Sequence, residues 1–245
     1  MPANAASVST SLISFSSKIS RQQFIAYVSV RNSGGSSTLA GHGKEANRKG
    51  VTFADSEAIL LETLARQERP VILVGHSAAG VLLQQAAGKA GDKISAVVFH
   101  NAFIIADGSS LFDALPPDIA KAFDAEAKAS ADNTLGVNDG FWRHVLLAGV
   151  EETQASEIIA QMVPQPFGYY THKIDTSSFA KLTAPKFVLL ATDDNSLPQA
   201  AWKAMAQSVG ESTLIQISGG HEALFTHPAD VAGGLATIAK LVAEQ

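Results

Sequence analysis

The stretch that most constrains the fold of this chain is VILVGHSAAG, residues 71–80. Its first four residues are apolar, as in a strand buried inside a sheet, and its last three are small, as at the start of a tightly packed helix. A buried strand usually ends in turn residues such as Asn, Asp or Pro, but here a Gly-His-Ser sequence follows it. The pattern predicts a strand that turns sharply into a helix and leaves the hydroxyl of Ser77 at the turn.

This layout is that of a nucleophile elbow, in which a serine on a strained strand-to-helix turn presents its hydroxyl. Gly75 and Ala79 flank the serine with little bulk, because larger side chains would collide across the turn. The motif usually ends in glycine, and Ala79 is the smallest departure from it. We interpret Ser77 as a nucleophile and the backbone N–H of Ala78 as an oxyanion donor at the helix N-terminus. The alternative is an ordinary turn in which the serine caps the helix.

The remainder of the chain alternates strand-like and helix-like segments. We expect strands at 24–30, 70–75, 94–103, 185–192 and 212–218, and helices at 52–67, 78–91 and 228–244. Thr52 or Asp55 is the expected cap of the first helix. The segment 104–180 reads as helices and loops without clear strands. Alternation of this kind predicts an α/β protein with a mostly parallel, doubly wound sheet.

Composition sets broad limits on function. A length of 245 residues suits one large α/β domain or two small ones, and 46% hydrophobic residues are enough for a packed core. The net charge of −5 argues against nucleic acid or an anionic membrane as the main partner. The absence of cysteine excludes disulfides, thiolate nucleophiles and cysteine-based zinc sites. No apolar run approaches the roughly 18 residues of a transmembrane helix.

Residues 1–23 form an atypical, serine-rich N-terminal segment, and the first acidic residue of the chain is Glu45. The segment lacks the long apolar core of a secretory signal, although a serine-rich, acid-poor stretch also fits an organelle transit peptide. We favour a weakly structured extension and a cytoplasmic protein. Because serine interrupts its apolar residues, we expect an edge or irregular segment rather than a central strand beside residues 70–75.

A nucleophilic serine needs a base and an acid that orients it, which in this architecture follow in the order Ser, Asp, His. Among the seven histidines, His221 is the best candidate because it follows the last expected strand and two glycines. His227 precedes a proline and reads as a surface or capping residue. The acid should follow the strand at 185–192, where Asp193 and Asp194 both stand. The spacing of the residues does not separate these two aspartates.

Four separated segments, PVILVGHSAAG, ISAVVFHNAF, LLATDDNSLP and GGHEALFTHPADVAGGL, resemble one branch of the α/β-hydrolase family. That branch holds plant methyl esterases, hydroxynitrile lyases and related bacterial esterases. The resemblance covers residues 24–245 and implies an α/β-hydrolase domain with a helical lid at about 103–180. The family carries its acid in a Thr-acid-Asp stretch with proline four residues later, which matches Asp194 and Pro198. The resemblance therefore implies a triad of Ser77, Asp194 and His221.

The chain departs from that family in two places. The lyases carry a lysine directly after the catalytic histidine, where this chain has Glu222, which favours ester hydrolysis over carbon–carbon cleavage. The family also begins with a strand ending in His-Gly, whose loop supplies a second oxyanion N–H, and no such pair precedes residue 24. The N-terminal strands are thus reduced or atypical, and the second oxyanion donor is unassigned. A weakly active or non-catalytic, ligand-binding homologue is the alternative.

We expect a small apolar carboxylic ester as the substrate, cleaved through an acyl-enzyme, because the lid segment is rich in aromatic side chains. The predicted substrate pocket consists of His76, Phe103, Trp142, Phe167 and Leu197. For the lid aromatics, the alternative is that they attach the lid to the sheet. No metal or organic cofactor is implied. The sequence does not determine the oligomeric state, and a homodimer is one alternative.

Overall fold

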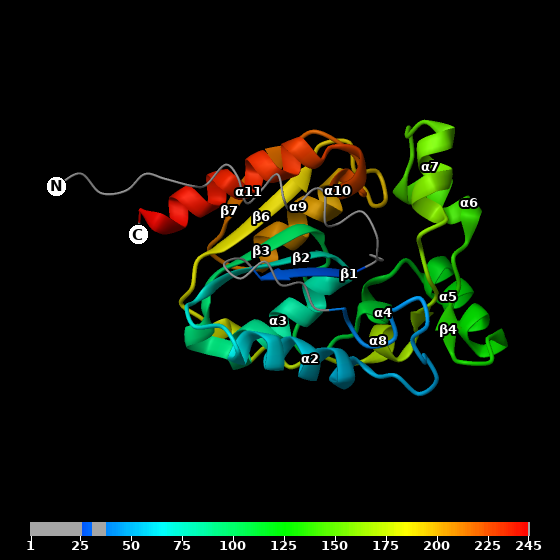
Figure 1. Cartoon of the computed structure of the whole chain (residues 1–245), viewed down its shortest axis with the longest axis horizontal. Coiled ribbons are helices and arrows are strands. Elements are labelled where there is room, and N and C mark those ends of the chain that lie inside the picture. The colour runs from blue at the N-terminus through cyan, green and yellow to red at the C-terminus, as the bar shows by residue number, and fades with distance from the viewer. Residues whose placement is uncertain (1–25, 31–37, 245) are drawn as a thin grey trace.

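A five-stranded sheet forms the centre of the molecule in the computed structural model, which describes residues 26–30 and 38–244. The strand order is β1–β2–β3–β6–β7, and β2, β3, β6 and β7 run parallel (Figure 1). The bounds are β1 Ala26–Val30, β2 Val71–Ser77, β3 Ile94–Ala102, β6 Lys186–Ala191 and β7 Thr213–Ile217. The predicted α/β fold with a mostly parallel sheet is confirmed. The expectations for residues 1–23 lie outside the described residues.

Strand β1 differs from the rest of the sheet in direction. It pairs antiparallel with β2, with Ala26 opposite Ser77 and Val30 opposite Leu73. The sequence predicts a mostly parallel sheet, and β1 departs from the parallel direction. Alternation fixes the order of the elements, whereas pairing with β2 decides the direction of the first strand. β1 therefore lies directly beside the strand that carries Ser77.

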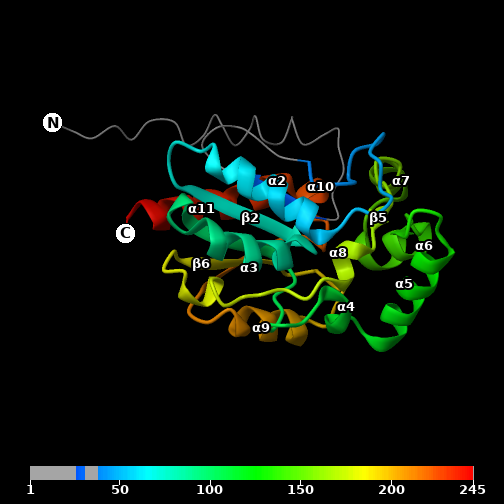
Figure 2. The same cartoon turned by 90° about the horizontal axis from the view of Figure 1, so that it is seen from below.

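Helices cover both faces of the sheet, as the view from below shows (Figure 2). Those that follow the sheet strands are α2 Phe53–Ala65, α3 Ala79–Ala90, α9 Gln199–Ser208, α10 Ala223–Thr226 and α11 Pro228–Ala243, with short 3-10 turns η2 Gly91–Lys93 and η4 Phe179–Lys181. Thr52 is the N-cap residue of α2, and its side chain accepts a hydrogen bond from Asp55 N while the Asp55 carboxylate accepts one from Thr52 N. The sequence offered Thr52 or Asp55 as the cap, and both residues take part in this capping box, with Thr52 at the N-cap position.

Two hydrophobic cores result from this layering. One face of the sheet, with Leu73, Val97 and Phe99, packs against α2, α3 and α9. The other face, with Val98 and Leu189, packs against α10 and α11. Strands β2 and β3 are almost continuously buried, as expected for parallel strands covered on both sides. No helix in the described ranges is long and apolar enough to cross a membrane.

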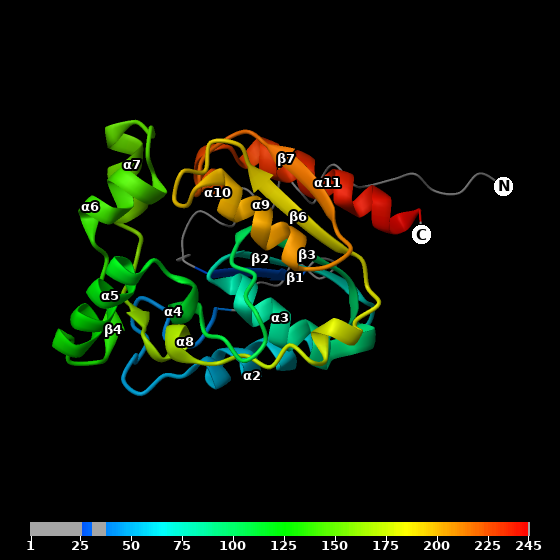
Figure 3. The ribbon, with the colours of Figure 1, turned by 180° about the vertical axis from the view of Figure 1, so that it is seen from behind.

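A mostly helical region lies at one end of the sheet, within the segment 103–180 for which the family resemblance predicts a lid (Figure 3). Its elements are α4 Leu111–Ala114, α5 Pro117–Ala129, α6 Asp139–Phe141, the π-helical turn η3 Trp142–Leu146, α7 Glu152–Ile159 and α8 Gly168–Thr171. Two short strands, β4 Thr134–Leu135 and β5 Gln165–Pro166, pair antiparallel within it. The sequence showed no clear strands here, because two-residue strands leave no periodic pattern. Arg143 in η3 forms ion pairs with Asp139 of α6 and Glu152 of α7, and so connects these three elements.

Candidate active site

Ser77 lies at the sharp turn between β2 and α3. Its φ of 52° is in the left-handed region, which is strained for a residue other than glycine. A Cβ on Gly75 would lie 2.5 Å from the side chain of Leu83, and one on Gly80 would lie 2.0 Å from the carbonyl oxygen of Phe103. The turn therefore needs its glycines at 75 and 80. Ala79 is fully buried and fits, which explains why this departure from the motif is tolerated.

Three side chains from separate parts of the chain form a continuous line of hydrogen bonds. Ser77 Oγ lies 2.9 Å from His221 Nε2, and His221 Nδ1 lies 2.8 Å from Asp194 Oδ2. Since the carboxylate can only accept, His221 Nδ1 donates to Asp194 and Nε2 is left to accept from Ser77. The structure thus separates the two candidate acids. Asp194 is fully buried against His221, whereas Asp193 is exposed and its carboxylate approaches only Thr192.

Asp194 is held as an anion by local donors. Its Oδ1 accepts hydrogen bonds from Ser196 N at 2.9 Å and Ser196 Oγ at 2.6 Å, and its backbone carbonyl accepts from Gln199 Nε2 at 2.7 Å. Burial acts to raise the pKa of Asp194. The charge and hydrogen bond of His221 and the bonds from Ser196 outweigh burial, and the pKa is lowered. Asp194 is therefore ionised at neutral pH.

Neighbouring side chains hold both the backbone and the ring of His221. Its backbone carbonyl accepts from His76 Nε2 at 2.9 Å and from Asn101 Nδ2 at 3.3 Å. Trp202 stacks on its imidazole, with ring centroids 5.9 Å apart. Burial acts to lower the pKa of His221, but the charge and hydrogen bond of Asp194 outweigh burial and raise it, with a smaller contribution from Glu222. The ring is thus both positioned and made a stronger base.

Asn101 connects three strand ends at this site. Its φ is 41°, its Oδ1 accepts from Ala191 N at 2.8 Å, and its Nδ2 donates to the loop that carries His221. Sequence reasoning missed Asn101, Ser196 and Trp202 as supporting residues. Ser196 had a signal, since a serine two residues after an aspartate commonly donates back to it in a turn. Asn101 and Trp202 had none, because their partners are remote in sequence.

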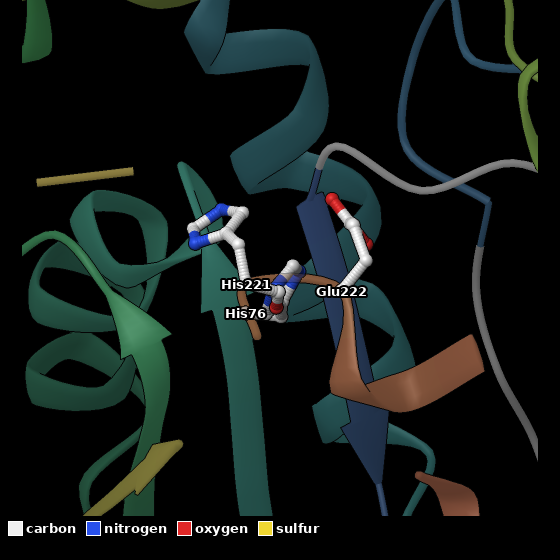
Figure 4. A group of neighbouring side chains, drawn as sticks. All are labelled: His76, His221 and Glu222. Carbon is white, nitrogen blue, oxygen red and sulfur yellow. The ribbon is translucent and has the colours of Figure 1, made fainter. Parts of the chain in front are cut away.

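His76, His221 and Glu222 form a buried group around the loop that follows β7 (Figure 4). One side-chain N or O atom of each lies within 4.8 Å of those of the other two. Both ring nitrogens of His221 are already hydrogen-bonded, and His76 Nε2 donates to a carbonyl. Only His76 Nδ1 and Glu222 remain as ligand donors, which is too few for a structural or catalytic zinc centre. We therefore interpret the group as part of a hydrogen-bonded site rather than a metal centre.

The predicted pocket residues lie in different places. Phe103 and Leu197 are half-buried and pack on the larger core, and Phe103 contacts the edge of Trp202, which stacks on His221. Phe167 is buried against Phe112 and Tyr170 in the lid region. Trp142 is buried in a separate cluster with Leu146, Leu147, Ala155, Ile158 and Met162. His76 is fully buried beneath His221, with its ring 4.9 Å from that of His221.

Ala78 directly follows Ser77 and is the N-cap residue of α3. Its backbone has helical angles, with φ of −57° and ψ of −22°, and its carbonyl accepts from the Tyr169 hydroxyl at 3.1 Å. Its N–H therefore belongs to the first turn of a buried helix, where the helix dipole favours negative charge. This is the placement that an oxyanion donor needs.

Comparison with known proteins agrees with this architecture. Residues 36–233 match the model of the alpha/beta hydrolase family, and the chain belongs to that family. No curated protein matches the chain. An extracellular alpha/beta-hydrolase from a Paenibacillus species, described as a structural and functional homologue of tobacco salicylic acid binding protein 2, is 27% identical. The match covers 82% of this chain and 85% of that one, with a TM-score of 0.77.

Two further esterases share the fold. A methylesterase from Arabidopsis is 18% identical over 84% of this chain and 86% of that one, with a TM-score of 0.64. Polyneuridine aldehyde esterase is 21% identical over 82% of this chain and 84% of that one, with a TM-score of 0.61. The family resemblance expected from the sequence, to plant methyl esterases and bacterial relatives, is confirmed.

Proposed function

We propose that this protein is a carboxylic ester hydrolase that acts through an acyl-enzyme on Ser77. The observation that carries the proposal is the hydrogen-bonded line from Ser77 Oγ through His221 to Asp194, with distances of 2.9 Å and 2.8 Å. These distances are those of a nucleophile and base poised for proton transfer. The esterases among the related structures support the same reaction class.

The reaction follows from the roles that this geometry allows. Ser77 Oγ attacks the ester carbonyl while His221 Nε2 takes its proton, and the backbone N–H of Ala78 donates to the developing oxyanion. His221 then returns the proton to the leaving alcohol. Asp194 keeps Nδ1 protonated and stabilises the imidazolium. Water, deprotonated by His221, releases the acid and restores Ser77.

A small apolar ester remains the proposed substrate class. Phe103 and Leu197 are half-buried apolar side chains. The ring of Phe103 contacts that of Trp202, and Trp202 in turn stacks on the His221 imidazole. Carbon–carbon lyase activity is disfavoured, because the position after His221 carries the carboxyl of Glu222 where a lyase needs a cation for cyanide. A cytoplasmic location and a homodimer are proposals that solution measurements must test.

Labelling with a fluorophosphonate probe tests the proposed function. The native protein should be labelled at Ser77 and should hydrolyse short p-nitrophenyl esters. Ser77→Ala should lose labelling and reduce hydrolysis to the background rate while keeping its melting temperature, because a small side chain is removed at a turn. A Ser77→Ala variant that kept most of the native rate would show that Ser77 is not the nucleophile, and an unlabelled, inactive native protein would favour the non-catalytic alternative.

A further inference from the structure

Glu222 is a buried carboxyl that the proposed mechanism does not use. Glu222 is only 2% exposed, and its Oε2 has no hydrogen-bond partner among the residues that the structure describes. Native structures rarely leave a buried carboxyl oxygen unpaired, because desolvation without a new hydrogen bond is unfavourable. Such an atom beside a candidate active site indicates that a ligand supplies the partner.

The position of Glu222 brings its carboxyl close to the reacting atoms. It directly follows His221, whose Nε2 lies 2.9 Å from Ser77 Oγ. One ring nitrogen each of His76 and His221 and a carboxyl oxygen of Glu222 lie within 4.8 Å of one another. Figure 4 shows the His221 ring and the Glu222 carboxyl extending to the same side of the loop. A carboxyl oxygen of Glu222 therefore lies close to the imidazole that hydrogen-bonds to Ser77.

The surroundings of Glu222 favour its protonated form. Burial raises its pKa from 4.5 to about 7, Asp194 adds to this rise and His221 opposes it. The other ionisable neighbours are His76 and, beyond it, His100, whose ring lies 5.0 Å from that of His76. Burial lowers the pKa of His100 to about 3 and that of His76 well below its usual value, so neither supplies a positive charge. Near neutral pH a large share of Glu222 thus carries an O–H donor.

We propose that Glu222, in its protonated form, donates a hydrogen bond to the carbonyl oxygen of the ester at Ser77 and so acts as the second oxyanion donor. This inference rests on the proposed function. When Ser77 Oγ bonds to the carbonyl carbon, the π electrons move onto the carbonyl oxygen. The Glu222 O–H and the N–H of Ala78 stabilise that charge, and Glu222 keeps its proton throughout. An apolar site can hold a carboxylic acid neutral for this purpose.

The competing explanation is that Glu222 acts on His76, whose Nδ1 is buried and also lacks a hydrogen-bond partner within residues 26–30 and 38–244. In that case Glu222 would position the site and would not touch the substrate.

Steady-state kinetics with p-nitrophenyl acetate from pH 5.5 to 9 test the proposal. Glu222→Met removes the donor and should lower kcat by about 100- to 1000-fold with little change in KM. Glu222→Gln keeps an N–H donor and should lose far less activity. The native protein should show a fall in kcat/KM above about pH 7, and Glu222→Gln should lack it, since its amide does not ionise. Asp193→Asn, which neutralises a nearby exposed carboxylate, should follow the native profile.

Two results would overturn the proposal. In the first, Glu222→Met and Glu222→Gln lose activity equally, or neither variant changes the pH profile. In the second, His76→Gln lowers kcat as much as Glu222→Met does, and the double variant loses no more than either single variant, which would place Glu222 in a positioning role.

Labelling of Ser77 by a fluorophosphonate in the native protein separates failure of this inference from failure of the proposed function. The infrared C=O band of a protonated carboxyl, present at pH 6 and absent from Glu222→Gln, provides a readout independent of activity.

Discussion

The two buried carboxyl groups near His221 have pKa values shifted in opposite directions. Asp194 is 0% exposed and Glu222 is 2% exposed, yet the pKa of Asp194 is lowered and that of Glu222 is raised to about 7. The difference lies in the donors that surround them. Asp194 accepts hydrogen bonds from Ser196 and His221, whereas Glu222 Oε2 has no hydrogen-bond partner in the described part of the chain. Burial alone therefore does not set the charge of a carboxyl, because nearby donors can outweigh it.

The largest expected effect comes from removing the charge of Asp194. Asp194→Asn keeps the shape of the side chain but no longer favours a proton on His221 Nδ1, so kcat should fall by about 10³- to 10⁴-fold. Asp193→Asn, at the exposed neighbour, should change kcat by less than about tenfold. Kinetics with p-nitrophenyl acetate check both variants. The reverse ranking would mean that the acid has been assigned one residue too late.

A smaller effect is expected from removing the donors of Asp194 while leaving its carboxylate. Ser196→Ala deletes the 2.6 Å hydrogen bond from Ser196 Oγ, and a bond to a charged group contributes enough for a loss of about 10- to 100-fold in kcat. The pKa of Asp194 should rise, because this bond helps to lower it. The acidic limb of the pH–rate profile and the acid-unfolding midpoint should both move to higher pH. Unchanged profiles would show that Asp194 does not depend on Ser196.

The smallest effect concerns stability and Glu222. The pKa of Glu222 in the folded protein, about 7, lies above its ordinary value of 4.5. A group with a raised pKa contributes its stability at low pH and loses it as pH rises through the folded value. The native protein should therefore lose melting temperature between about pH 5 and pH 8 relative to Glu222→Gln. Parallel melting curves for the two proteins across this range would contradict the assigned protonation.

The sequence determined the elements that depend on local pattern. Short-range spacing indicated the sharp turn at Ser77, the buried strands β2 and β3, the start of α2 near Thr52 and the placement of His221 after the last strand. The structure then showed that Thr52 and Asp55, which the sequence offered as alternative caps, act together. The choice of Asp194 over Asp193 came from the family resemblance and not from the spacing of residues. Local patterns are readable because helices, strands and turns each impose a period or a residue type on neighbouring positions.

Only the tertiary structure decided how remote groups meet. Asn101 reaches His221 across 120 positions, and Trp202 stacks on the same ring from α9. Trp142 lies in a cluster within the lid region, and β1 runs antiparallel beside β2. The opposite charge preferences of Asp194 and Glu222 likewise depend on which donors the folded chain brings to each carboxyl. Such contacts leave no periodic signal, because they are set by packing between segments whose separation along the chain is arbitrary.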